Sequence, residues 1–250
     1  MKQVMKQELL DLIKKFEEIK KLGYIKSINN YSSGGGLTLE KLLNANAGNL
    51  CYPDLNGIEL KTINKFWKKN INLFCDTPFF QKNKYESSVK IFVKKYGYHN
   101  KGYKKVFNGK INAKSLTQVG LLYYFRLKVL REKEIIILQI FDLGKNLINE
   151  EIYWDFKILK HKLEIKLKYL ALIYLEKKYI KSVQYCKYTK MNLYILKDFN
   201  TFINLIEEGL IEVTFSTGYF KGDKHNERFH DHGTKFTINE KDINKLFNKI

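Results

Sequence analysis

The sequence predicts an α/β protein whose mixed β-sheet is flanked by helices, and three observations lead to this class. Residues 3–22 repeat apolar positions at helical spacing, with Leu9 and Phe16 on one side. Short runs rich in β-branched and aromatic residues, such as 58–63 and 134–141, are bounded by turn formers and predict strands. Helical and extended segments alternate irregularly along the chain, which favours a mixed sheet.

The N-terminal half begins with the helix 3–22, which should stop at Gly23, a residue that readily adopts the left-handed conformation after a helix. The loop Tyr31–Gly36 precedes a short helix expected from Leu37 to Asn44. A turn over 52–57, rich in Pro, Asp, Asn and Gly, should lead into the strand 58–63. Further strands are expected at 71–74, 89–93, 120–130 and 134–141.

The C-terminal half contains the strongest helix signal, because apolar residues from Phe156 to Tyr174 line one face of the segment 155–178. A last helix is expected from an Asn239 cap to the C-terminus. Between them we expect a strand near 179–187, a helix near 199–208 that ends before Gly209, and strands near 210–220 and 234–238 around a polar loop.

The charge of the chain indicates a polyanionic partner. The 250 residues carry a formal net charge of +19 and are 44% hydrophobic, so the chain can fill a core and still attract anions. Nucleic acid is the first candidate, because neutralising phosphates releases counterions; an anionic membrane surface is the second. Of the 45 basic residues, 42 are Lys and three are Arg, so an AT-biased genome could account for part of the excess.

The cellular compartment of the protein can be inferred from its apolar segments and its cysteines. No apolar run approaches the ~20 residues that span a bilayer, and the N-terminus lacks the apolar core of a signal peptide. Cys51, Cys75 and Cys186 are scattered, which is typical of a reducing compartment without disulfides. We therefore expect a soluble cytoplasmic protein.

One short segment carries the residue types that phosphodiester hydrolysis needs. Residues 54–61 read Asp54-Leu-Asn-Gly-Ile-Glu59-Leu-Lys61, and on a strand Glu59 and Lys61 would share a face. Asp54, brought round by the turn, would meet Glu59 at one ion, and such an oxygen-rich site suits Mg²⁺. Lys61 would orient or help to deprotonate the attacking water and offset phosphate charge. A solvated strand edge would give the same pattern by chance.

A second cluster, 228–235, is the densest group of polar functional side chains. Arg and Lys can grip guanine, and His, Asp and Thr can also donate to or accept from base edges. A hairpin would place residues 214–221 beside it. There are two alternatives: an exposed polar loop that makes no contact with DNA bases, and a metal site at His230 and His232. The expected DNA-reading residues are Arg228, His230, Asp231, His232, Thr234, Lys235, Tyr219 and Lys221.

These motifs resemble, in the same order, those of the MvaI/BcnI family of Type II restriction endonucleases and, more distantly, the MutH-like strand-nicking enzymes. The resemblance lies in Gly36-Leu-Thr-Leu-Glu40, Pro53-Asp54, Gly57-Ile-Glu59-Leu-Lys61-Thr62, Asn72-Leu-Phe74, Thr77-Pro78, Phe141-Asp-Leu-Gly144, Tyr153-Trp-Asp-Phe156 and His230-Asp-His-Gly-Thr234-Lys-Phe236. It touches most of the chain.

The resemblance implies a PD-(D/E)XK fold with two lobes around a DNA cleft. The catalytic lobe would cover about 30–175 and the recognition lobe about 179–238 within one endonuclease domain. Asp54 and Glu59 would hold the metal, Lys61 would be the catalytic lysine, and Glu40 would be an additional helical acid. For Glu40 the alternative is a solvated charge near a helix N-terminus.

The activity that the resemblance implies is Mg²⁺-dependent cleavage of double-stranded DNA at a short CC/GG-flanked site, with Mn²⁺ as a substitute metal. The enzyme would act as a monomer, one strand at a time, alongside a cognate DNA methyltransferase. Two alternatives stay open at this point: a MutH-like nicking endonuclease, and a basic DNA-binding protein without catalysis.

Overall fold

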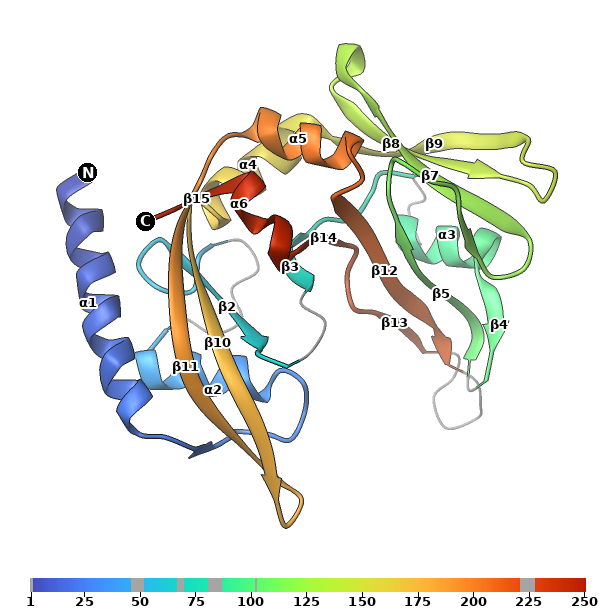
Figure 1. Ribbon diagram of the computed structural model, residues 1–250. Coiled ribbons are helices and arrows are strands. Elements are labelled where there is room, and N and C mark those ends of the chain that lie inside the picture. Colours follow the sequence, from blue (N-terminus) through green and yellow to red (C-terminus); the bar gives the residue numbers. More distant parts are fainter. Residues whose placement is uncertain (1, 46–51, 67–69, 81–86, 102, 221–227) are drawn as a thin grey trace. The chain divides into compact units, whose positions relative to one another are not determined.

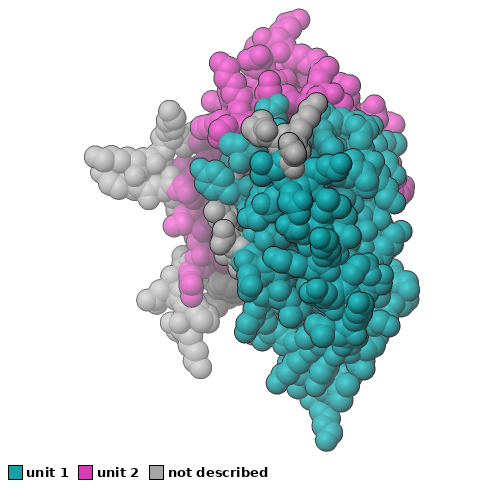
Figure 2. Space-filling view, turned by 90° about the vertical axis from the view of Figure 1, so that its left-hand side faces the viewer, with its two compact units in different colours: residues 1–71, 162–197, 243–250 teal, residues 72–161, 198–242 magenta. Residues whose placement is uncertain are grey.

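The computed structural model describes residues 2–45, 52–66, 70–80, 87–101, 103–220 and 228–250. Within these residues the protein is a mixed α/β structure with three sheets and six α-helices (Figure 1). The chain divides into two compact units, each assembled from separate segments (Figure 2). Unit 1 comprises 1–71, 162–197 and 243–250, and unit 2 comprises 72–161 and 198–242. The predicted α/β class with a mixed sheet is confirmed.

Unit 1 is built on a sheet whose centre is a long antiparallel hairpin of β10 (Tyr169–Ile180) and β11 (Val183–Leu196). Strand β2 (Ile58–Asn64) pairs with β10 in parallel, which makes the sheet mixed. The short strands β1 (Ile25–Lys26) and β15 (Phe247–Lys249) both pair with β11.

Helices α1 (Lys2–Lys21) and α2 (Gly34–Leu43) supply the hydrophobic cover of one face of this sheet. Leu12 and Phe16 of α1 and Leu39 of α2 share a buried cluster with Ile58 and Leu60 of β2. Because side chains alternate along a strand, the other set of β2 residues lies on the opposite face, called here the outer face. The catalytic candidates of β2 belong to that set.

Unit 2 contains two sheets and an aromatic core. The first follows the order β3 (Asn70–Cys75), β14 (Lys235–Asn239), β12 (Ile211–Phe220), β5 (Tyr103–Ile111) and β4 (Tyr98–Asn100), with β13 (Phe229–Asp231) also on β12. The second follows the order β6 (Thr117–Val119), β7 (Tyr123–Leu130), β8 (Ile135–Phe141) and β9 (Leu147–Asp155). Phe92, Phe107, Phe125 and Phe215 pack edge-to-face or stacked at its centre.

The remaining helices are α3 (Ser88–Tyr96), α4 (Phe156–Lys166), α5 (Phe199–Glu207) and α6 (Ile243–Leu246), with 3₁₀ turns at Arg131–Lys133 and Glu240–Asp242. The described residues contain no helix with the length and apolarity to cross a bilayer.

Many predicted elements are confirmed with small shifts of their ends. They are the helices 3–22 and 199–208 and the strands 58–63, 71–74, 120–130, 134–141, 210–220 and 234–238. The backbone after the two helices is left-handed, with φ of 66° at Gly23 and 70° at Gly209. The predicted helix Leu37–Asn44 begins earlier, at Gly34, because the glycine run forms its first turn.

Two predictions were wrong because burial overrode the local pattern. The segment 89–93 is part of helix α3, whose Ser87 cap accepts a hydrogen bond from Lys90 N at 3.4 Å. The predicted helix 155–178 ends at Lys166, and strand β10 follows. The run Leu170–Ile173 is fully buried, so it lacks the polar alternation that distinguishes a strand from a helix.

Three further segments differ from the prediction. The expected strand 179–187 spans the end of β10, a two-residue turn at Lys181 and Ser182 with φ of 47° and 63°, and the start of β11. The expected C-terminal helix is only one turn long and gives way to β15. Strands β5 and β9 were not predicted.

Candidate active site

The turn before β2 folds Asp54 back onto the strand. Leu55 and Ile58 exchange two backbone hydrogen bonds of 3.0 and 2.7 Å, while Asn56 and Gly57 adopt left-handed φ values of 44° and 88°. As a result, Asp54 Oδ2 accepts a hydrogen bond of 2.9 Å from Leu60 N. The carboxylate of Asp54 is therefore held beside the strand that carries Glu59, as the sequence analysis expected.

Glu59 is buried, with 1% of its surface exposed, and its two oxygens have different surroundings. Oε1 accepts a hydrogen bond from Lys61 Nζ and lies 3.5 Å from Lys166 Nζ. Oε2 is buried without a hydrogen-bond partner among the described residues. An unsatisfied carboxylate oxygen is costly, so this atom indicates a ligand position.

Lys166 is a site residue that the sequence analysis missed. It is the last residue of α4, and its side chain is 11% exposed compared with 24% for Lys61. Strand β10 starts three residues later and pairs Leu170 with Glu59, which brings the end of α4 beside the site. Glu164-Ile165-Lys166 has the same Glu-x-Lys spacing as Glu59-Leu60-Lys61, but residues two apart in a helix do not face each other, so the spacing alone does not mark Lys166.

Burial and mutual repulsion perturb the carboxyl groups. Burial raises the pKa of Glu59 to about 7; Asp54 also raises it, whereas Lys61 and Lys166 lower it. The pKa of Glu40 is raised by burial and then by Asp54, against the opposing effect of the two lysines. Asp54 therefore adds to the cost of ionising both Glu40 and Glu59, and a bound cation would relieve that cost.

Glu40 lies in the same cluster. It is the seventh residue of α2 rather than part of its first turn, so the alternative of a solvated N-terminal charge does not hold. A Cβ at Gly36 would lie 3.8 Å from Glu40 Oε1 and 3.5 Å from Thr62 Oγ1 of β2, which places the Glu40 carboxyl near that strand. Unit 1 thus brings together Glu40, Asp54, Glu59 and Lys61.

The oxygen set fits a hard divalent cation. The described residues contain no group of three or more His, Cys, Asp or Glu side chains arranged to hold a metal ion. Mg²⁺ commonly binds through one or two carboxylates and keeps several waters. Asp54 and the open Glu59 Oε2 meet that requirement.

The second predicted cluster gathers in unit 2 around strand β13. Pairing with β12 places His230 opposite Gly218 and Asp231 opposite Thr217. Thr217 Oγ1 donates to His230 O at 3.1 Å, and the rings of His230 and His232 have centroids 5.1 Å apart. Burial lowers the pKa of His230, as does His232.

The other predicted reading residues differ in accessibility. In the strand register, Tyr219 lies opposite Phe229 and Lys235 lies opposite Thr214. The side chain of Arg228 is exposed to solvent. Thr234 is 1% exposed, so its side chain is not displayed at the surface. Lys221 lies outside the described residues.

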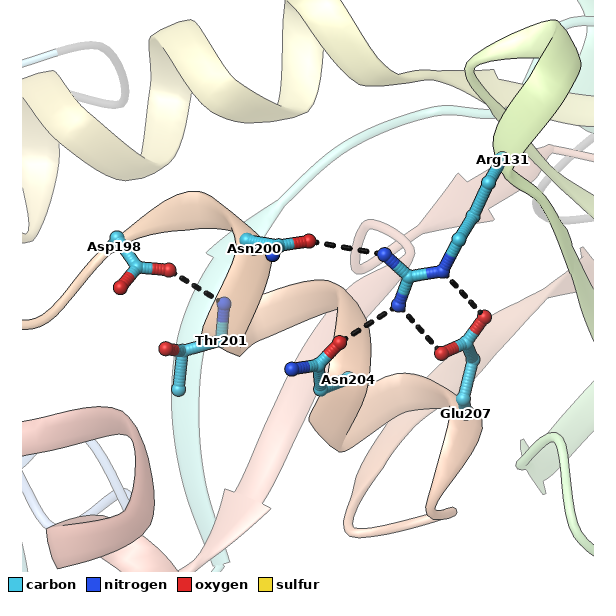
Figure 3. Close-up of polar contacts among 6 residues, drawn as sticks. All are labelled: Arg131, Asp198, Asn200, Thr201, Asn204 and Glu207. Carbon is cyan, nitrogen blue, oxygen red and sulfur yellow. Dashed lines mark hydrogen bonds and ion pairs between the residues drawn. The ribbon is translucent and has the colours of Figure 1, made fainter.

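The other two arginines serve the fold of unit 2. Arg131 forms a four-bond fork onto helix α5, donating to both carboxylate oxygens of Glu207 at 3.0 and 2.6 Å and to Asn200 and Asn204 at 2.9 and 2.7 Å (Figure 3). Arg126 donates twice to Gln139 Oε1, at 3.1 and 2.9 Å. Arg228 lies on the surface, within the second cluster.

Comparison with known proteins agrees with this arrangement of motifs. No curated protein matches the chain in sequence. The solved structures that are similar include the complex of restriction endonuclease MvaI with its cognate DNA substrate and MvaI in the absence of DNA. The first has 26% sequence identity and a TM-score of 0.86, covering 97% of this chain and 98% of that chain. The second has 25% identity and a TM-score of 0.60, covering 97% and 96%.

A sequence model of the MvaI/BcnI restriction endonuclease family matches residues 13–247, which is nearly the whole chain. The alternative of a non-catalytic DNA-binding protein is therefore set aside. The chain belongs to the MvaI/BcnI restriction endonuclease family, a family of site-specific deoxyribonucleases.

Proposed function

We propose that this protein is a Mg²⁺-dependent Type II restriction endonuclease of the PD-(D/E)XK kind, with its cutting site in unit 1. The observation that carries the proposal is the open Glu59 Oε2 beside Asp54, opposite an oxygen that two lysines contact. A divalent cation held by Asp54 and Glu59 would polarise the scissile phosphate and offset the charge that develops during hydrolysis.

The side chains of the site have separate tasks in this proposal. The ammonium groups of Lys61 and Lys166 hold Glu59 through Oε1, which would leave Oε2 available to bind a cation. Lys61 is the more exposed of the two and is the group that orients the attacking water. Glu40 adds a third negative charge to the site.

Sequence reading belongs to unit 2 in the proposal. Arg228 offers a planar fork for guanine, and the exposed residues Asp231 and His232 offer groups for base edges beside the β12–β13 pair, where the ring nitrogens of His230 are buried. The relative MvaI was crystallised with its cognate DNA substrate. We propose that this chain likewise binds double-stranded DNA, as a monomer, at a short CC/GG-flanked site.

The test is plasmid cleavage by the purified protein with Mg²⁺. Discrete fragments that disappear on addition of EDTA are expected, and nicked circles that never become linear would instead identify a MutH-like nicking enzyme. Asp54→Ala and Lys61→Ala should each reduce cutting by at least ~10³-fold, because both act on the developing charge. Glu18→Gln is the matched control, because Glu18-Ile19-Lys20 has the same Glu-x-Lys spacing at an exposed position of α1, and this variant should cut normally. Normal cutting by Asp54→Ala would overturn the assignment.

A further inference from the structure

The outer face of the unit 1 sheet continues well beyond the candidate active site. The register pairs Glu59 with Leu170 and Lys61 with Leu172, so the outer set of β10 residues includes Tyr174, Glu176 and Lys178. Pairing of β11 and β1 with these strands adds three positions beside them. The outer positions beyond the candidate active site include four with basic side chains, Lys26, Lys178, Lys187 and Lys190.

Of these four lysines, Lys187 lies opposite Glu176 in the strand register and helps to lower the pKa of that carboxyl. In the part of the chain that the structure describes, none of them forms an ion pair, whereas the neighbouring Lys65 contacts Glu176 at 3.1 Å. Glu176 is thus occupied by a fifth lysine, and Tyr24 also donates to its carboxylate at 3.4 Å. The four together are called the lysine face.

Tyr24 organises the centre of the lysine face without neutralising it. Lys178 Nζ lies 3.8 Å from the centroid of the Tyr24 ring, and Lys187 Nζ lies 5.9 Å from it. A cation–π contact fixes an ammonium group but leaves its charge available to an anion. Two of the four lysines are therefore held in place beside one ring while their charge remains available to an anion.

The spacing of the lysine face suits the backbone of a nucleic acid duplex. From Leu170, beside Glu59, to Lys178 is a step of eight residues, or ~26 Å along the strand. At 3.4 Å per nucleotide along the axis, that distance corresponds to ~8 base pairs. A duplex whose scissile phosphate lies at Glu59 would have its flanking phosphates within reach of the lysine face.

We propose that the lysine face binds the phosphate backbone of the duplex that flanks the cutting site, without reading its sequence. This inference rests on the proposed function, because it takes the scissile phosphate to lie at Glu59. It assigns to unit 1 a share of DNA affinity that is separate from base reading.

The test compares cognate duplexes with ~3 and ~15 base pairs of flank, using wild-type protein and the variant Lys178→Glu/Lys187→Glu/Lys190→Glu. Binding is measured in Ca²⁺ over a range of salt concentrations, and single-turnover cutting in Mg²⁺. Each phosphate contact adds ~0.9 to the magnitude of the slope of log affinity against log salt concentration. For the long duplex, the magnitude of this slope should therefore be about 2–3 smaller in the triple variant than in the wild type. The control is Lys14→Glu/Lys15→Glu/Lys21→Glu, an equal charge change on exposed residues of α1.

The expected result is at least a tenfold loss of affinity for the long duplex in the lysine-face variant, a much smaller loss for the short one, and little effect in the control. If the variant keeps the wild-type preference for the long duplex, or if the control loses as much affinity, the inference is overturned while the proposed function stands. The inference is also overturned if the variant loses binding only to anionic lipid vesicles. Failure of the wild type to cut either duplex would count against the proposed function itself.

Discussion

Glu59→Gln should make the metal-free protein more stable at pH 8 while abolishing cutting. Burial raises the pKa of Glu59 from 4.5 to about 7, so folding disfavours its ionised form. One pKa unit corresponds to 1.36 kcal/mol, and the difference of 2.5 therefore corresponds to about 3 kcal/mol of lost stability at pH 8. Gln has nearly the shape of the protonated acid and avoids that loss.

The pH dependence follows from the direction of the shift. Below pH 4.5 the carboxyl is protonated in both folded and unfolded chains, so wild type and variant should be equally stable. Between pH 4.5 and 7 the unfolded chain ionises first, and the wild type loses stability as the pH rises through the folded pKa. The gap between the two proteins should grow over this window and stay constant above it.

Urea unfolding in EDTA at pH 5 and pH 8 measures that gap. Glu176→Gln is the matched control on the neighbouring strand, because Lys65 lowers the pKa of Glu176 and the substitution should not stabilise. Added Mg²⁺ should stabilise the wild type by mass action and leave Glu59→Gln unchanged. The reasoning is refuted if Glu59→Gln is no more stable than wild type at pH 8, or if the gap is the same at both pH values.

Three further predictions concern the helix that carries Glu40, the Arg131 fork and base reading. Gly34→Ala should lower the free energy of unfolding by about 1–3 kcal/mol, because the added Cβ would lie 2.4 Å from Asn29 O. Gly36→Ala is the control: its Cβ would have its nearest contact at 3.5 Å, so urea unfolding should show the same or a higher free energy of unfolding. Arg131→Lys should lower the unfolding free energy by about 1 kcal/mol, since an ammonium group cannot reproduce the fork onto Glu207, Asn200 and Asn204; equal midpoints for the two proteins would count against it. Arg228→Ala and His232→Ala, at two exposed positions, should lose discrimination between cognate and mismatched duplexes by about 1–3 kcal/mol while retaining nonspecific binding. Unchanged discrimination in a competition assay would exclude these residues from base recognition.

The part of the site that lies within one turn and one strand was visible in the sequence. Strand alternation put Glu59 and Lys61 on one face, and the Pro and Gly around Asp54 indicated the turn that the structure contains. The family resemblance added Glu40 on a helix, and α2 carries it.

What the sequence did not reveal depends on long-range pairing. Lys166 lies beside Glu59 because β10 pairs in parallel with β2, although the two residues are more than a hundred positions apart in the sequence. No local sequence pattern encodes the register of that pairing. The same pairing buries Leu170–Ile173 on both faces, which made a strand resemble the continuation of α4. In α3 the buried positions Val89, Phe92, Val93 and Tyr96 have helical spacing. Over the five residues 89–93, however, the apolar side chains of 89, 91 and 93 also alternate as in a strand.

The most direct test of a cation held by Asp54 and Glu59 is the anomalous diffraction of Mn²⁺ in crystals of the protein bound to uncleaved DNA. We predict a peak about 2–2.3 Å from Glu59 Oε2 and from a carboxylate oxygen of Asp54. Its absence there, or a peak at His230 and His232 in its place, would contradict the assignment of the cutting site to unit 1.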